Sequence, residues 1–191
     1  MRITGGELRG RRLKTPPGAD VRPTQDMVRE ALFSMLQEVV PESSFLDLFA
    51  GSGSVGIEAW SRGARSVTWV EGSRKVAQTL EGNVNTLCDA NPGRVFVEDV
   101  FKWIARPLSG AEKFDIVFAD PPYSVEGRSD GIENVIVALS GAGKLAKDAI
   151  FVAEQRTGSP LPDAPGWDMA KERHYGNSRI LIFKWKNGGE E

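Results

Sequence analysis

Hydrophobic residues recur at helical spacing in the first part of this chain. They are Val28, Leu32, Met35, Leu36 and Val39. This spacing predicts one amphipathic helix that begins after an N-cap at Thr24 and continues until Pro41. Before it, Ile3-Thr4 and residues 8–13 flank Gly5-Gly6, which predicts a short pair of strands that ends at residues 16–18, Pro-Pro-Gly.

From residue 44 on, apolar segments of strand length alternate with segments of helical periodicity. The expected strands are residues 44–49, 66–70, 94–98, 114–119, 149–154, 167–173 and 178–185. The expected helices are residues 55–62, the stretch that carries Val76, Leu80, Val84 and Leu87, a short segment through Phe101 and Ile104, and residues 132–139. This alternation predicts a mostly parallel sheet that is covered by helices on both faces.

Length and composition limit the classes of protein that this chain can be. Its 191 residues suit a single domain over residues 1–191, with a hairpin extension at 1–22 and a catalytic core at 23–191. Hydrophobic residues make up 40% and charged residues 26% of the chain, as in soluble globular proteins. No apolar run approaches the roughly 20 residues that span a membrane, and the start has no apolar signal sequence. We therefore expect a cytoplasmic protein without a membrane partner.

One cysteine, Cys88, and one histidine, His174, are the only residues of these types. Together they can form neither an internal disulfide nor a zinc cluster, so we expect no metal. Cys88 lies in a helix-to-turn stretch and is expected to be a small, partly buried apolar residue. His174 is expected to be a polar residue on a closing strand, with a place in a pocket as the alternative.

The net charge of −2 is unevenly distributed. Residues 1–22 hold six basic and two acidic residues, a charge of +4, so the rest of the chain carries −6. The candidates for contact with nucleic-acid phosphates are Arg9, Arg11, Arg12, Lys14 and Arg22. A basic segment on an acidic body suits local phosphate contact, whereas a solvated surface hairpin is the alternative.

A glycine-rich turn follows the first expected strand. Gly51 and Gly53 allow the backbone to turn sharply and to approach a ligand, and the helix start beyond them offers free N–H donors. Glu71 ends the next strand, where an acid can accept hydrogen bonds from the ribose hydroxyls of NAD or of S-adenosylmethionine. Asp99 ends the third strand and could reach an adenine amino group, while the Val100 N–H donates to the ring. A helix N-cap or a solvated loop is the alternative for each acid.

The fourth strand ends in Asp120-Pro121-Pro122-Tyr123, which indicates the reaction. Two successive prolines stiffen the loop and remove two N–H donors, so the loop presents hydrogen-bond acceptors. The Asp120 carboxylate and the Pro121 carbonyl can hold the N–H groups of a planar amine and favour the pyramidal form that attacks a methyl sulfonium. The Tyr123 ring can stack on a base. A Pro-Pro turn without a chemical role is the alternative.

These segments resemble known methyltransferase motifs. Residues 47–56 resemble the first motif of class I S-adenosylmethionine methyltransferases, and residues 120–123 resemble their amino-methylating signature. Over nearly its whole length the chain resembles the RsmD family. The matching residues are Arg2-Ile3, Gly5-Gly6, Arg9-Gly10-Arg11, Leu13, Arg22-Pro23-Thr24, Val28-Arg29-Glu30, Leu32-Phe33 and Tyr175-Gly176-Asn177-Ser178-Arg179.

The resemblance implies a Rossmann-like class I methyltransferase fold, with a mostly parallel seven-stranded sheet and a C-terminal antiparallel hairpin. It implies methyl transfer from S-adenosylmethionine to the N2 amine of a guanine in 16S ribosomal RNA, as in these bacterial enzymes. The partner would be ribosomal RNA or the small ribosomal particle, and we expect a monomer. Cofactor contacts carried over from the family are Asp47, Ala50, Gly51, Gly53, Glu71, Asp99, Val100, Thr24 and Arg29, with Asp120 and Tyr123 at the target amine.

Five other functions are alternatives to this prediction. A dehydrogenase would share the glycine turn and Glu71, but His174 falls late in the chain and the Asp120 loop has no part in hydride transfer. A DNA adenine-N6 or protein glutamine-N5 methyltransferase could use the same loop, although the length leaves little room for a DNA-recognition domain. A carbon-methylating enzyme would need a cysteine nucleophile. A noncatalytic RNA-binding module would not need an intact acceptor loop.

Overall fold

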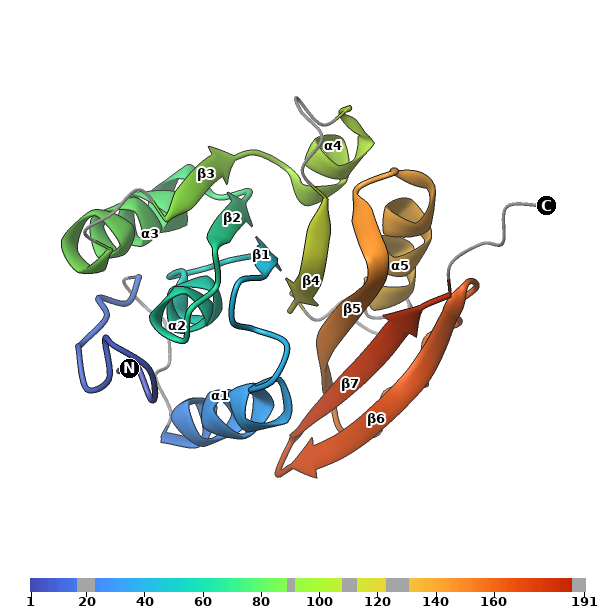
Figure 1. The fold of residues 1–191 in the computed structure, drawn as a ribbon, viewed down its shortest axis with the longest axis horizontal. Coiled ribbons are helices and arrows are strands. Elements are labelled where there is room, and N and C mark those ends of the chain that lie inside the picture. The colour runs from blue at the N-terminus through green and yellow to red at the C-terminus, as the bar shows by residue number, and fades with distance from the viewer. Residues whose placement is uncertain (17–22, 89–91, 108–112, 123–130, 187–191) are drawn as a thin grey trace.

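The computed structural model of the protein describes residues 1–16, 23–88, 92–107, 113–122 and 131–186. Its centre is a seven-stranded sheet with the strand order β3-β2-β1-β4-β5-β7-β6 (Figure 1). The strands are β1 (Ser44–Leu48), β2 (Ser66–Glu71), β3 (Gly93–Val97), β4 (Phe114–Ala119), β5 (Leu145–Arg156), β6 (Trp167–Tyr175) and β7 (Ser178–Trp185). The helices are α1 (Pro23–Met35), α2 (Ser54–Ser61), α3 (Arg74–Leu87), α4 (Val100–Ala105) and α5 (Ile132–Gly141).

Strands β1 to β5 run parallel, whereas β7 pairs antiparallel with both β5 and β6. The expected parallel sheet with a C-terminal antiparallel hairpin is therefore confirmed. The strand order reverses at β1, which lies between β2 and β4. In open parallel sheets a ligand binds beyond the carboxyl ends of the strands at this reversal. The topology thus directs attention to the ends of β1 and β4.

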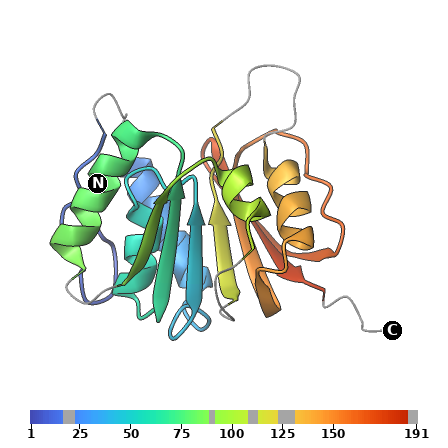
Figure 2. The same cartoon turned by 90° about the horizontal axis from the view of Figure 1, so that it is seen from above.

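Helices cover both faces of the sheet (Figures 1 and 2). Successive side chains of a strand point to opposite faces. In β1, Phe45 packs with α1, α2 and α3, and its ring stacks on Phe33 at 6.3 Å between centroids. Leu46 and Leu48 point the other way and join the cluster that α4 and α5 form. Because both faces are buried, all five residues of β1 are buried.

Helix α1 differs from its expected limits at both ends. It ends at Met35 rather than at Pro41, and Val40, not Val39, is buried in the core. Beyond Met35 the N–H groups of Val39 and Val40 both donate to the Leu36 carbonyl, so the chain makes a separate turn before Pro41 instead of continuing the helix. At the other end Thr24 lies in the first turn and is not the N-cap, because the helix begins with Pro23, a residue suited to the first helical position.

Two other expectations need correction. The first strand ends at Leu48, because Phe49 adopts a left-handed backbone conformation with φ 57°. The expected N-terminal strand pair reduces to a single bridge between Arg2 and Arg12, with Ile3 N–H donating to the Arg11 carbonyl at 2.9 Å. We call residues 1–14 the N-terminal arm. It doubles back as a hairpin does, with further backbone hydrogen bonds from Gly10 N to the Ile3 carbonyl and from Leu13 N to the Met1 carbonyl, and it is also held by the protein body.

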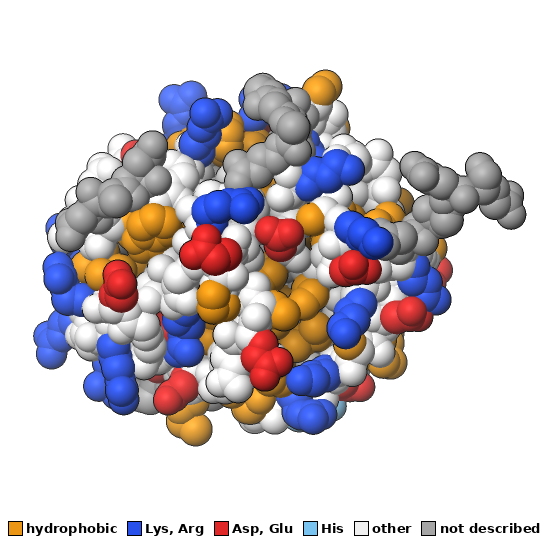
Figure 3. Space-filling model, in the orientation of Figure 1, with side chains coloured by type: hydrophobic (Ala, Val, Ile, Leu, Met, Phe, Trp, Pro, Cys, Tyr) orange, Lys and Arg blue, Asp and Glu red, His pale blue; other side chains and the backbone are white. Residues whose placement is uncertain are grey.

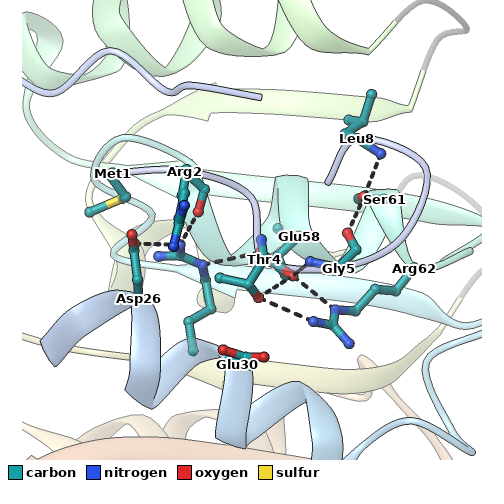
Figure 4. Close-up of polar contacts among 12 residues, drawn as sticks. Met1, Arg2, Thr4, Gly5, Leu8, Asp26, Glu30, Glu58, Ser61 and Arg62 are labelled. Carbon is teal, nitrogen blue, oxygen red and sulfur yellow. Dashed lines mark hydrogen bonds and ion pairs between the residues drawn. The ribbon is translucent and has the colours of Figure 1, made fainter. Parts of the chain in front are cut away.

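The carboxylate of Glu58, fully buried on α2, ties the N-terminal arm to the body (Figure 4). It accepts hydrogen bonds from Thr4 N at 2.8 Å, from Thr4 Oγ1 at 2.7 Å and from Gly5 N at 2.8 Å. Ion pairs with Arg62 at 2.9 Å and with Arg29 at 3.2 Å balance its charge. A buried charge is tolerated when it is paired and hydrogen-bonded in this way. Arm, α1 and α2 therefore meet at one side chain.

The turn between β1 and α2 leaves no room for side chains at two glycines. Gly53 has φ 81°, and a Cβ there would lie 2.3 Å from Leu80 Cδ1. A Cβ at Gly56 would lie 2.2 Å from Trp69 Nε1. Only glycine allows α2 to begin this close to α3 and β2.

Gly53→Ala is expected to lower the free energy of unfolding by roughly 1–3 kcal/mol, because it places a Cβ in a left-handed conformation and against Leu80. Gly82→Ala is the matched control in the interior of α3, where an added Cβ meets nothing within 4 Å. That change is expected to stabilise the protein by about 0.5–1 kcal/mol. Urea unfolding followed by circular dichroism measures both, and equal effects would contradict the steric argument.

Candidate active site

A cavity of about 190 Å³ opens at the carboxyl ends of β1, β4 and β5. It brings together five residues that the sequence singled out, namely Arg29, Asp47, Ala50, Gly51 and Asp120. Its other lining residues are Met1, Val28, Leu32, Phe49, Ser52, Ser54, Val55, Phe118 and Glu154. Two larger cavities, of about 310 and 420 Å³, lie between the N-terminal arm and α1 and beside α3. Neither contains the predicted cofactor-binding or catalytic residues, so we treat the first cavity as the candidate active site.

Asp47 is a buried carboxyl that holds the glycine turn in place. Its Oδ2 accepts a hydrogen bond from Gly56 N at 2.8 Å, which fastens β1 to the first turn of α2. Burial raises the pKa of Asp47 well above its usual value; the Gly56 N–H opposes this, and the nearby Asp120 and Glu71 carboxylates add to it. Asp47 thus lies close to both of the other acids, Asp120 and Glu71.

Glu71 holds the same turn from the β2 side. Its two carboxylate oxygens accept hydrogen bonds from Gly51 N at 2.9 Å and from Ser73 N at 2.7 Å. Asp99 is exposed and caps α4, where it accepts a hydrogen bond from Lys102 N at 3.0 Å. The side chain of the next residue, Val100, is buried in the core. Both acids therefore follow their strands as expected, with Glu71 beside the pocket and Asp99 in the role of a helix N-cap.

Asp120 and Glu154 both line the pocket, and each directly follows a residue that takes part in the pairing of β4 with β5. Ala119 at the end of β4 is in register with Ala153 in β5, so the two acids follow on neighbouring strands. Asp120 is open to water on the pocket side but otherwise enclosed by protein, and this enclosure together with the Glu154 charge raises the pKa of Asp120 to about 8. Burial also raises the pKa of Glu154, although the Ser178 hydroxyl donates a hydrogen bond to it.

Neither of these two carboxyls forms an ion pair with any other residue that the structure describes. Two carboxylates that share a site without a cation repel each other, and the pair retains a proton more readily than either acid alone. Such an arrangement destabilises the fold and is typical of functional sites. Glu154 was missed in the sequence, where residues 149–154 were interpreted only as a closing strand. An acid at the end of that strand, as after three others, was the available signal.

Arg29 lines the pocket, but its guanidinium is engaged elsewhere. It bonds to Glu58, to Asp26 at 2.8 Å and to the main-chain carbonyl of Arg2. It therefore joins α1 to the N-terminal arm at the wall of the pocket. The side chain of Thr24 lies outside the described part of the chain.

Two further predicted site residues, Tyr123 and Arg22, lie outside the described residues. Pro121 is buried at the end of β4, and Pro122 is exposed.

The basic side chains of the N-terminal arm point to solvent. Those of Arg9, Arg11, Arg12 and Lys14 are all exposed. Basic side chains lie along the edge of the molecule on which the arm lies, and other basic and acidic side chains are spread over the rest of this face (Figures 1 and 3). The main chain at Lys14 is fixed by two hydrogen bonds with Asn83, both of 2.9 Å.

The remaining single residues behave as the sequence suggested. His174 is exposed on β6 and lies 3.1 Å from Glu172, away from the pocket, which confirms it as a polar residue of a closing strand. Cys88 is buried at the end of α3. In the part of the chain that the structure describes, no helix is long and apolar enough to cross a membrane.

Comparisons with known proteins agree with this architecture. A family model described as "Conserved hypothetical protein 95" matches residues 1–184. Proteins named ribosomal RNA small subunit methyltransferase D are 36% identical over 191 residues in Escherichia coli K12 and 35% identical over 185 residues in Haemophilus influenzae. The alignments cover 100% and 96% of this chain and 92% and 93% of those relatives.

Solved structures agree as well. The Escherichia coli structure named "Putative methyltransferase yhhF" superposes with a TM-score of 0.84 at 34% identity, covering 97% of this chain and 98% of its own. The Rossmann-like class I methyltransferase fold is thereby confirmed. With this match along its whole length, the chain belongs to the RsmD family, that of ribosomal RNA small subunit methyltransferase D.

Proposed function

We propose that this protein transfers a methyl group from S-adenosylmethionine to the exocyclic N2 amine of a guanine in 16S ribosomal RNA. The observation that carries the proposal is Asp120, an acceptor without a cation partner among the described residues, placed in the pocket beside the glycine turn. The names of the relatives support ribosomal RNA as the substrate. The choice of guanine N2 rests on the resemblance of residues 120–123 to an amino-methylating loop.

The residues of the turn fit the cofactor. A Cβ at Gly51 would meet only the Phe49 carbonyl, at 3.9 Å, so this side of the turn presents bare backbone to open space. S-adenosylmethionine supplies an electrophilic methyl group when it is bound. In this proposal Glu71, which accepts a hydrogen bond from Gly51 N, binds the ribose, and Asp99 at the N-cap of α4 binds the adenine together with the Val100 N–H. Asp47 keeps the turn in shape through Gly56.

Asp120 would act on the amine of the target base. Its carboxylate and the Pro121 carbonyl accept hydrogen bonds from the two N–H groups, which directs the nitrogen lone pair toward the methyl carbon. The nitrogen–carbon bond forms while the carbon–sulfur electron pair stays on sulfur, and the amine gives up one proton. An ionised Asp120 can accept that proton. A DNA adenine or a protein glutamine would be handled by the same two acceptors and is the alternative substrate.

Replacement of Asp120 tests the proposal. Asp120→Ala is expected to lower methyl transfer by roughly 100-fold or more, because the acceptor of the amine is removed. The assay uses labelled S-adenosylmethionine with unmodified small-subunit RNA and particles, and mass spectrometry identifies the methylated nucleoside. Asp115→Asn, at the other end of β4, is the control and should retain activity. Methylated guanine that persists with Asp120→Ala would refute the role of Asp120. Label found on an adenine or on a protein glutamine would instead contradict guanine as the target of methylation.

The rate should depend on pH through Asp120. Its pKa is raised to about 8, so in the free enzyme the group is protonated at low pH, where it is a weaker hydrogen-bond acceptor and cannot take the proton that the amine gives up. We therefore expect kcat/KM to rise with pH and to level off above about 8, because kcat/KM reports groups of the free enzyme. A profile that is flat from pH 6 to pH 9 would contradict a rate that depends on ionisation of this carboxyl near pH 8.

The basic side chains of the N-terminal arm are proposed to bind RNA phosphates. Joint replacement of Arg9, Arg11, Arg12 and Lys14 by Ala is expected to weaken RNA binding and to reduce the slope of log K against log salt by about 0.7 for each phosphate that is no longer neutralised. Binding measured across a salt series gives this slope. Lys113→Ala with Lys147→Ala is the control, because both side chains are exposed at the amino ends of β4 and β5, away from the arm. If the arm variant keeps the wild-type slope of log K against log salt, the arm does not bind RNA phosphates and is a solvated surface segment.

A further inference from the structure

Glu154 has no part in the methyl transfer described above, yet it lines the same cavity as Asp120. It is partly buried at the C-terminal half of β5, held by the Ser178 hydroxyl from β7, and forms no ion pair with a residue that the structure describes. A residue kept for stability would have a cation or several donors around it, as Glu58 has. Glu154 instead adds a second negative group beside Asp120.

We propose that Glu154 determines the specificity of the enzyme for guanine, by accepting the N1–H of the base while Asp120 accepts the N2 amine. This inference rests on the proposed function. Guanine presents N1–H and N2–H₂ as adjacent donors on one edge. Two neighbouring acceptors that follow the paired residues Ala119 and Ala153 match that pattern.

Other amines do not match two acceptors. Adenine presents an amino group next to N1, which is an acceptor, and cytosine presents one next to N3, also an acceptor. A glutamine side chain presents its amide N–H₂ next to a carbonyl oxygen. In each case a lone pair would face the Glu154 carboxylate, and a buried acceptor left without a donor is costly. When both carboxyls are ionised, the same pair of acids that binds guanine would therefore reject the alternative substrates.

The surroundings of the two acids suit a flat base. Phe49 and Phe118 line the cavity together with the aliphatic side chains of Val28 and Leu32, so apolar walls flank the acceptors. Within such walls a hydrogen bond to a carboxylate discriminates more strongly than it does in water. Phe49 is kept at this position by a left-handed backbone and by an edge contact with Phe101 at 6.4 Å.

The test compares guanine with 2-aminopurine at the methylated position of the RNA substrate. The analogue keeps the N2 amine but has an acceptor at N1. Wild-type protein is expected to lose about tenfold or more in kcat/KM on the analogue. Glu154→Gln is expected to lose activity on guanine. It is also expected to lower the ratio of kcat/KM on guanine to kcat/KM on 2-aminopurine, because the glutamine amide can donate a hydrogen bond to N1 of the analogue. Glu81→Gln, exposed on α3, is the control and should keep the wild-type ratio.

Melting temperature separates recognition from a structural role. Removing one of two uncompensated carboxylates should leave the melting temperature of Glu154→Gln unchanged or raise it. A lowered melting temperature together with an unchanged guanine to 2-aminopurine ratio would overturn the inference. Should Glu154→Gln not fold, Glu154→Asp decides: it keeps the charge but shortens the reach, so the ratio should fall, and an unchanged ratio overturns the inference.

The outcomes keep the two proposals distinct. If wild-type protein methylates guanine and Glu154→Gln preserves the ratio, Glu154 is not the specificity determinant, while the proposed function stands. If wild-type protein methylates no guanine in any RNA, the proposed function itself fails.

Discussion

The left-handed turn between β1 and α2 is the constraint on which the rest of the site depends. Gly53 must be glycine there because its φ is 81° and Leu80 occupies the space of a side chain. Asp47 and Glu71 then hold the turn from two strands through the N–H groups of Gly56 and Gly51. Without this turn, neither the exposed backbone of the cradle nor the start of α2 would lie at the strand reversal, where ligands of parallel sheets bind.

Acidic groups are treated in two opposite ways within one small region. Glu58 is compensated by two arginines and three further donors, so its burial holds the N-terminal arm against α1 and α2. Asp120 and Glu154 receive no such compensation among the described residues, and enclosure raises the pKa of each. The paired Glu58 stabilises the fold. Asp120 and Glu154, which have no cation partner among the described residues, lower stability at a place where a ligand with hydrogen-bond donors can bind.

The fold could be predicted closely because hydrophobic periodicity reflects burial directly. Each of the seven strands and five helices overlaps the segment in which the alternation of patterns placed it, although β5 is longer than expected and β6 consists mostly of polar residues. The ends were less predictable. After Met35 the chain makes a separate turn from Leu36 to Val40, and Phe49 takes a conformation that its type rarely adopts, so the periodic pattern gave the wrong limits for α1 and β1.

The sequence by itself determined the chemistry along the chain: the glycine turn, Glu71, Asp99 and the Asp120 loop follow successive strands, and strand order in a parallel sheet brings such ends to one edge. Only the tertiary structure decided which of them share a pocket. It joined Asp120 to Glu154, 34 positions later, because β5 pairs with β4, and it turned Asp99 into a cap and Arg29 into a partner of Glu58. Contacts between distant residues depend on strand pairing and packing, which local pattern does not contain.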